Sequence, residues 1–208
     1  MKILINDYSG HPFPFELSQL LSKKYQIVHS YAEYFETPKA NFKTKSKDSK
    51  LKIVPIKINK KFTKDNFFLR RANDIYYGKK LINLIKLQKP NIVVCSNTPL
   101  EPLHKIIGHC NENNIKTIFW MQDIYSLAIS RILKKKVPIL GQIIGMYYFY
   151  LEKRCEHISD KIIVISSDFR KFLDKESLNK TSVVENWSPV IKPKLNKIKF
   201  YKKRFNPL

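Results

Sequence analysis

The chain has 208 residues, of which 43% are hydrophobic and 12% aromatic, enough for one well-buried domain of ordinary size. Its 39 Lys and Arg residues against 17 Asp and Glu residues give a formal net charge of +22. Such a charge favours anionic partners, whether nucleic acid, anionic lipid or phosphorylated substrates. The abundance of Lys, Ile and Asn throughout the chain also fits a general compositional bias without selection for charge at single sites.

Cysteine content and hydropathy exclude several classes of protein. Three widely spaced cysteines do not make a disulfide framework or a zinc knuckle, so we expect reduced, structural thiols in a cytosolic protein. The first residues turn polar too soon for a signal peptide. The longest apolar stretch, Val137 to Leu151, is shorter than the ~20 residues of a membrane-spanning helix. Zinc, P-loop and nucleophile-elbow motifs do not occur, and we expect no metal ion and no other cofactor.

Apolar runs alternate with helical periodicity along the whole chain. A short strand over 3–5 is followed by a turn and by a helix over 13–21. A Lys-rich connection of about twenty residues ahead of residue 51 predicts a mobile surface loop. Further strands are predicted over 26–29, 51–56, 91–95, 116–121, 161–165 and 181–184, further helices over 66–88, 99–113 and 139–157, and a short helix capped by Ser167 and Asp168.

These strands are apolar throughout, which is typical of a parallel sheet with both faces covered. The sequence therefore predicts an α/β fold: a Rossmann-like, doubly wound domain with a mostly parallel sheet over residues 1–190. Residues 191–208 carry many basic and no acidic side chains, so we expect a basic linker that leads out of the domain.

Polar residues that directly follow the strands are the candidate ligand contacts, because ligands of open α/β sheets bind beyond the carboxyl ends of the strands. Gly10 and His11 follow the first strand, where glycine allows close backbone approach and histidine titrates near neutral pH. Asn97 precedes a helix whose free amides suit an anionic or hydroxyl-rich ligand, with plain N-capping by the next residue as the alternative. Gln122 and Asp123 follow a later strand. Asp123 fits a general base, an orienting hydrogen-bond acceptor or a structural cap.

A basic cluster precedes an aromatic helix in the last third of the chain. Its members are Arg131, Lys134, Lys135 and Lys136, and the sequence after them runs into Met146 to Tyr150. Basic residues beside an apolar face are typical of proteins that rest on an anionic membrane, and a solvated charge run beside a core helix is the alternative. Helix-turn-helix, zinc and aromatic RNA-binding motifs do not occur, so we expect no nucleic-acid partner.

Six segments carry a resemblance to a known family. They are 3–15 (ILINDYSGHPFPF), 96–103 (SNTPLEPL), 119–125 (FWMQDIY), 141–152 (GQIIGMYYFYLE), 162–169 (IIVISSDF) and 184–189 (VENWSP). In this order and spacing they resemble the N-terminal domain of family 4 GT-B glycosyltransferases, in particular the branch that builds bacterial surface polysaccharides such as colanic acid.

The resemblance implies a function as well as a fold. In this family the N-terminal Rossmann-like domain binds the acceptor, the C-terminal one binds the nucleotide-sugar donor, and transfer retains the anomeric configuration without a metal ion. The sequence ends before a donor domain begins. We therefore expect the acceptor-binding half of a truncated or split enzyme, inactive alone and able to use a nucleotide-sugar donor only with a C-terminal domain.

The resemblance also implies site residues and partners. Gly10, His11 and Asn97 would lie along the inter-domain cleft, and Gln122 and Asp123 would lie near the acceptor hydroxyl, with Asp123 as the candidate base. The expected acceptor is a lipid-linked, pyrophosphate-bearing saccharide at the inner face of the cytoplasmic membrane, on which the chain would be peripheral. The alternative function is a non-catalytic basic domain that docks on anionic membrane or on a partner protein.

Overall fold

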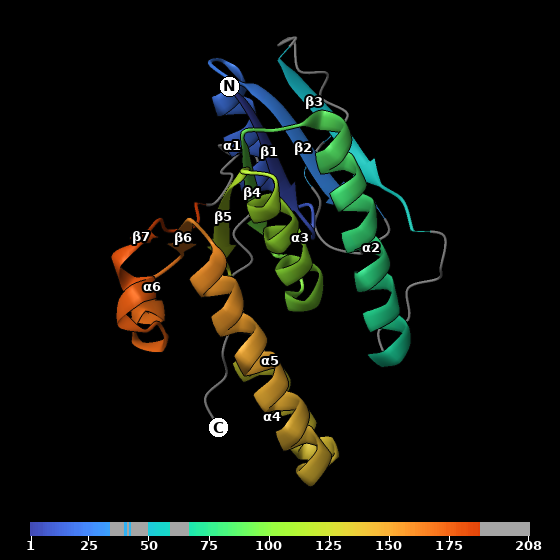
Figure 1. Cartoon of the computed structure of the whole chain (residues 1–208), viewed down its shortest axis with the longest axis vertical. Helices are drawn as coiled ribbons and strands as arrows, with labels where there is room; N and C mark the ends of the chain where they lie inside the picture. The colour runs from blue at the N-terminus through green and yellow to red at the C-terminus, as the bar shows by residue number, and fades with distance from the viewer. Residues whose placement is uncertain (34–39, 41, 43–49, 59–66, 188–208) are drawn as a thin grey trace, which may run out of the picture.

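The computed structural model describes residues 1–33, 40, 42, 50–58 and 67–187, and these form an α/β domain with one parallel sheet (Figure 1). Within them the sheet has seven strands in the order β3-β2-β1-β4-β5-β6-β7. The predicted fold class is confirmed. The strands are β1 Lys2–Asp7, β2 Gln26–Ala32, β3 Leu51–Ile56, β4 Ile92–Ser96, β5 Lys116–Met121, β6 Lys161–Val164 and β7 Thr181–Val183. The helices are α1 Pro12–Ser22, α2 Phe67–Gln88, α3 Leu100–Glu112, α4 Tyr125–Lys136, α5 Pro138–Ile158, α6 Lys175–Asn179 and a 3₁₀ helix Ser167–Phe172.

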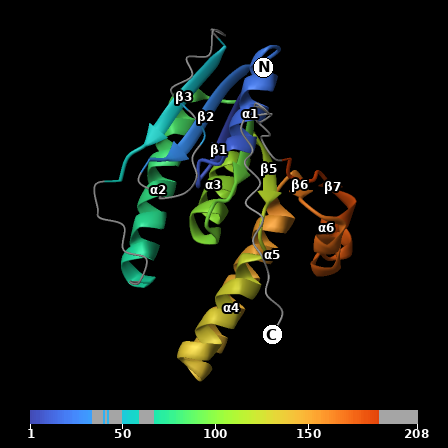
Figure 2. The same ribbon diagram turned by 180° about the vertical axis from the view of Figure 1, so that it is seen from behind.

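Helices cover both faces of the sheet, which is why apolar side chains point to both sides of its central strands. In β1, Leu4 belongs to one core, while Ile3 and Ile5 belong to the core on the opposite face. Helix α1 packs on the face of Ile3 and Ile5, and α2, α3 and α5 pack on the other (Figures 1 and 2). The sheet is therefore the middle layer of three.

Two helices were not predicted from the sequence, and one cap was predicted at the wrong residue. Helices α4 and α6 occupy segments that were interpreted as a polar loop and a charge run or left unassigned. The 3₁₀ helix is capped by Ser166, whose hydroxyl accepts from the Asp168 amide at 3.2 Å, and not by Ser167 and Asp168. Most of the predicted surface loop before residue 51 and all of the predicted linker lie outside the described residues.

Helices α4 and α5 form a hairpin that projects beyond the carboxyl-end edge of the sheet (Figures 1 and 2). Three residues separate the end of β5 from the start of α4, and Val137 joins α4 to α5. Among the described residues, no helix combines the length and apolar character needed to span a lipid bilayer.

Candidate functional site

The strand order reverses between β1 and β4, and this position defines the candidate ligand site. Both strands run parallel, and the register places Asp7, the last residue of β1, opposite Ser96, the last residue of β4. The connections from these two strands leave in opposite directions, so a crevice is expected outside their carboxyl ends. Gly10, His11 and Asn97 all follow these two strand ends, as the sequence predicted.

The backbone at this switch point takes the left-handed conformation twice. Gly10 has a φ of 74°, and its amide donates to the Asp7 carbonyl at 3.1 Å, which closes the turn between β1 and α1. Asn97 has a φ of 52°, a conformation that asparagine tolerates better than most residues. These turns bring His11, the N-cap residue of α1, and the Asn97 side chain to the end of β1.

A buried carboxylate joins the three predicted residues. Asp7 is fully buried, and it accepts hydrogen bonds from the Asn97 side-chain amide at 2.9 Å and from the His11 backbone amide. Burial raises the pKa of Asp7 to about 7, although these hydrogen bonds and the amides of Ser9 and Gly10 act to lower it. A buried carboxyl group with such a raised pKa at a strand end is typical of functional sites.

A second layer of polar side chains holds this arrangement in place. Asn6 is fully buried and donates to Thr98 Oγ1 at 2.9 Å. Its Oδ1 accepts from the hydroxyls of Ser30 at 3.0 Å and Tyr77 at 2.6 Å. Thr98 in turn donates to the Ser96 carbonyl at 3.1 Å, and α3 has no side-chain cap at its N-terminus. Plain N-capping of α3 by Thr98, the alternative interpretation, is therefore wrong.

A second buried carboxyl group with a raised pKa is that of Asp74. Asp74 of α2 is buried and accepts a hydrogen bond from the Tyr8 hydroxyl. Burial raises the pKa of Asp74 to about 6 against the lowering effect of that bond. The sequence analysis assigned no role to Asp7 or Asp74. A polar residue that ends an otherwise apolar strand was the available signal for Asp7.

Gln122 and Asp123 lie two strands away from Asp7, at the carboxyl end of β5. Gln122 is buried, and its Oε1 accepts from Asn186 Nδ2 at 2.7 Å. Its Nε2 is buried and has no hydrogen-bond partner among the described residues. Asp123 is exposed. The structure thus gathers Gly10, His11 and Asn97 around one carboxylate and pairs Gln122 with the segment after β7.

The predicted basic cluster lies on the hairpin, away from the switch point. Arg131, Lys134 and Lys135 are exposed on α4, and Lys136 is the last residue of that helix. The hairpin contains a cavity of about 290 Å³ between α4, α5 and the 3₁₀ helix. The cavity is therefore separate from the carboxyl ends of β1 and β4.

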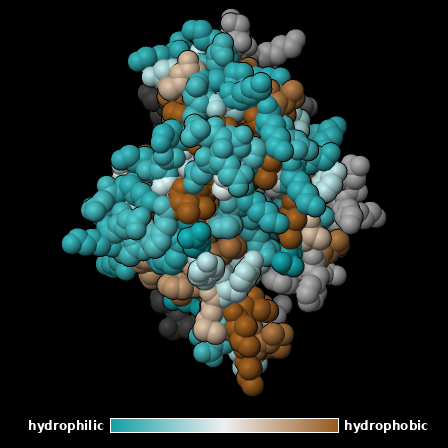
Figure 3. Space-filling view, viewed as in Figure 1, coloured by the Kyte–Doolittle hydropathy of each residue, from teal (hydrophilic) through white to brown (hydrophobic). Residues whose placement is uncertain are grey.

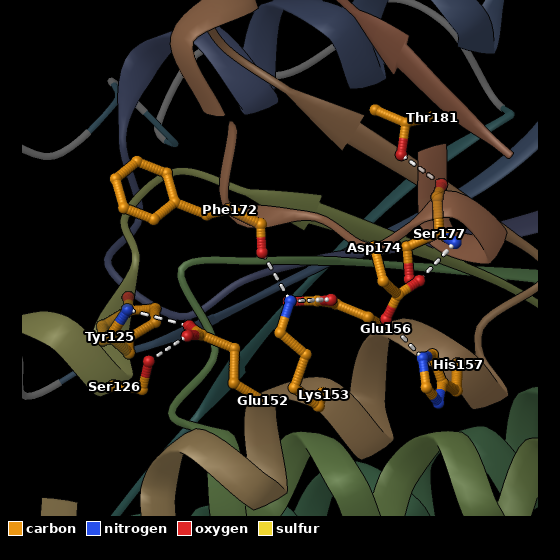
Figure 4. A network of polar contacts seen from close by, with 10 residues as sticks. All are labelled: Tyr125, Ser126, Glu152, Lys153, Glu156, His157, Phe172, Asp174, Ser177 and Thr181. Atoms are coloured by element: carbon orange, nitrogen blue, oxygen red, sulfur yellow. Dashed lines mark hydrogen bonds and ion pairs between the residues drawn. The ribbon is translucent and has the colours of Figure 1, made fainter. Parts of the chain in front are cut away.

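Glu152, Lys153 and Glu156 line the hairpin cavity and form hydrogen bonds with neighbouring residues (Figure 4). Glu152 of α5 accepts from the Tyr125 amide at 2.9 Å and from the Ser126 hydroxyl, which fixes the first turn of α4. Lys153 donates to Glu156 at 2.7 Å and to the Phe172 carbonyl at 2.6 Å. Burial raises the pKa of Glu156 to about 7 despite this lysine. These contacts join α5 to α4 and to the 3₁₀ helix.

No protein-family model and no curated protein matches the sequence. Solved structures of glycosyltransferases do match the fold. Glycyrrhiza uralensis UGT73P12, complexed with glycyrrhetinic acid 3-O-monoglucuronide, matches with a TM-score of 0.59 at 9% identity, over 88% of this chain and 48% of that one. Arabidopsis thaliana UGT89C1, complexed with UDP-L-rhamnose, matches with a TM-score of 0.53 at 13% identity, over 88% and 48%. LpCGTa in complex with UDP matches with a TM-score of 0.51 at 11% identity, over 92% and 55%.

The chain has the fold of part of a GT-B glycosyltransferase and spans about half the length of the solved structures it matches. The identities are low, so the likeness concerns the fold. It does not distinguish family 4 or the colanic acid branch from other GT-B enzymes.

Proposed function

We propose that the chain is the acceptor-binding half of a retaining, metal-independent glycosyltransferase of surface polysaccharide biosynthesis. The observation that carries this proposal is the polar site at the β1/β4 switch point, built on a GT-B fold around Asp7 and Asn97. The family 4 resemblance of the sequence supports the acceptor side and the retaining chemistry. In this proposal a nucleotide-sugar donor binds to a second domain.

Each candidate residue has a distinct role in the proposal. Asp7 accepts from the Asn97 amide and thereby fixes that side chain beside the left-handed turn. Gly10 lets the acceptor approach the backbone, and His11 starts α1 beside it. The buried Nε2 of Gln122 has no hydrogen-bond partner among the described residues. A sugar hydroxyl would accept a hydrogen bond from it after a small movement of the residues that cover it.

Asp123 is the proposed base. It is exposed directly after β5, so it can reach a substrate that approaches from solvent. The family 4 resemblance suggests a lipid-linked, pyrophosphate-bearing saccharide as the acceptor, and the net charge of +22 suits such an anionic substrate.

An NMR titration of the ¹⁵N-labelled chain tests the proposal with two separate probes, citronellyl pyrophosphoryl N-acetylglucosamine and UDP. We expect the saccharide probe to shift the backbone resonances of Gly10, Asn97 and Gln122, and UDP to leave them unchanged. Asn97→Ala and Gln122→Ala should each weaken binding of the saccharide probe by about five- to tenfold, the effect of one hydrogen bond. Asn113→Ala is the matched control, because Asn113 lies exposed at the end of α3.

Two outcomes would contradict the assignment. If UDP shifts the same resonances and the saccharide probe does not, the chain is a donor-side domain. If neither probe binds at the switch point although the spectrum reports a folded chain, the site has another ligand and the glycosyltransferase proposal fails.

A further inference from the structure

The α4–α5 hairpin exposes an apolar apex that the fold itself does not cover. From Pro138 to Leu151, α5 contains no charged residue, although charged residues make up 27% of the chain. The first turns of this segment are farthest from the sheet (Figures 1 and 2), whereas Tyr148 and Leu151 near its end are buried in the core. An apolar helix segment at such a position requires an explanation other than core packing.

Two glycines explain why the large side chains of the hairpin face outward. A Cβ atom on Gly141 would lie 2.5 Å from the Leu133 carbonyl oxygen, and one on Gly145 would lie 2.8 Å from Ser130 Oγ. Helices α4 and α5 therefore touch through glycine, and both glycines are buried. Since the contact between the helices leaves no room for bulky residues, the isoleucines and leucine near the apex are directed away from it.

These outward side chains form one surface, which we call the apex surface. Its apolar members are Ile132, Val137, Ile139, Leu140, Ile143 and Met146. All are exposed, and Ile139 is 82% exposed. In the space-filling view the lower end of the molecule is correspondingly hydrophobic (Figure 3). A contiguous apolar surface of this kind on a soluble domain marks an interaction site.

The basic residues next to the apex surface indicate which kind of partner binds there. Arg131, Lys134 and Lys135 are exposed on α4 beside it. A second copy of the chain, with the same net charge of +22, would bring like charges together at this surface. An anionic lipid bilayer offers opposite charge to the basic residues and apolar volume to the isoleucines.

We propose that the apex surface docks on anionic lipid bilayers, with Ile139, Leu140 and their apolar neighbours below the headgroups and the basic residues of α4 at the lipid phosphates. The sequence analysis placed the membrane contact on the basic residues and on the aromatic stretch. The hairpin geometry adds the apolar apex as the inserting element. The apex surface contains none of the switch-point residues, so its test is independent of the proposed glycosyltransferase function.

Vesicle co-sedimentation of the full chain tests the proposal, with vesicles of phosphatidylcholine alone and vesicles that also contain phosphatidylglycerol. We expect binding to the anionic vesicles. The double change Ile139→Asp and Leu140→Asp should lower the partition coefficient at least about tenfold, since two apolar side chains no longer leave water. The matched control is Leu20→Asp with Leu87→Asp, which changes two exposed leucines on α1 and α2 and should leave binding unchanged.

Lys134→Glu with Lys135→Glu should also lower binding about tenfold or more at low salt, with a smaller effect at high salt. A second measurement reports insertion directly. The native cysteines are buried, so Ile139→Cys can be labelled with an environment-sensitive dye. Its emission should shift to the blue on anionic vesicles if the apex enters the bilayer.

Three results would overturn the proposal. Equal vesicle binding by the wild type and the Ile139/Leu140 double variant would leave only electrostatic adsorption. Unchanged dye emission on bound vesicles would exclude insertion even if the double variant misfolds. Loss of self-association in the double variant by analytical ultracentrifugation, with no vesicle binding by the wild type, would assign the apex surface to a second copy of the chain.

Discussion

The burial of the His29 imidazole predicts how much the free energy of unfolding falls in acid. His29 lies on β2 and is fully buried against α1, with the Phe15 ring centroid 5.3 Å from its own. Its Nδ1 lies 2.8 Å from Ser18 Oγ, and the Ser18 hydroxyl also donates to the Pro14 carbonyl at 2.9 Å. With that proton donated to Pro14, we assign the ring proton of neutral His29 to Nδ1. Nε2 then has no hydrogen-bond partner among the described residues.

A proton added at Nε2 would place an uncompensated charge in the core, and burial accordingly lowers the pKa of His29 to about 3. In the unfolded chain the pKa of His29 stays near 6.5. Because the pKa of His29 is lower in the folded chain than in the unfolded one, neutral His29 contributes its full stabilisation above pH 6.5. This stabilisation is lost progressively as the pH falls towards 3. At about pH 5 the unfolded chain binds nearly one extra proton at this site, which lowers the free energy of unfolding by about 2 kcal/mol.

The variant His29→Phe removes this titration and keeps a ring at the same position. Urea unfolding at about pH 7.5 and about pH 5, followed by the fluorescence of buried Trp120, measures the free energy of unfolding of both proteins. The wild type should lose about 2 kcal/mol more than the variant between these pH values. Any constant effect of repacking cancels in this comparison, as do the groups common to both proteins. Equal pH dependence in the two proteins would refute the assignment of His29 as a neutral buried imidazole.

Further predictions concern three substitutions in α2 and α3. A Cβ atom on Gly78 would lie 2.6 Å from Pro102 Cβ, so Gly78→Ala should destabilise the chain by about 1–3 kcal/mol in urea unfolding. Gly108→Ala in α3, with nothing within 4 Å of the new Cβ, should stabilise it by about 0.5–1 kcal/mol; the same sign for both changes would contradict the contact geometry. Arg71 donates to the buried Glu101 carboxylate from Nε, which is shared between both oxygens at 2.8 Å and 2.9 Å, and from Nη2 at 2.8 Å, but it is half exposed. Arg71→Met should therefore cost about 1–2 kcal/mol in the same assay, and a neutral result would show that water replaces the guanidinium.

The strands and most helices could be predicted because burial on two faces leaves a local signal. Each central strand has an apolar run of at least three residues or is mostly apolar, and β3 and β5 begin and end where the sequence predicted. Helix α4 could not be predicted in the same way. Its residues combine a polar start with a basic end, and its position depends on contacts with Gly141 and Gly145 of another helix. Tertiary packing, which no local pattern encodes, decides its structure.

The candidate site shows the same division between local and long-range information. Gly10 and Asn97 could be found because residues after strands meet at one edge of a parallel sheet. The role of Asp7 could not be predicted, because it depends on the pairing of β1 with β4 and on the side-chain amide of Asn97, which is 90 residues away in the chain. A sequence identifies the side chains at a strand end, whereas the strand order decides which two ends become neighbours.

Taken together, the two proposals constrain how many sugars the acceptor carries. Gln122 and Asp123 connect β5 directly to α4, so the proposed acceptor contacts and the apex surface belong to one continuous segment. Helix α4 has 12 residues and therefore rises about 18 Å. If the apex rests on a bilayer with α4 upright, Asp123 stands at most about that far above the headgroups, and a tilted hairpin brings it closer. A lipid-linked acceptor must bridge this gap with its pyrophosphate and sugars. An upright hairpin would thus favour acceptors that already carry several sugars, whereas efficient use of a single-sugar lipid would require the hairpin to lie along the membrane.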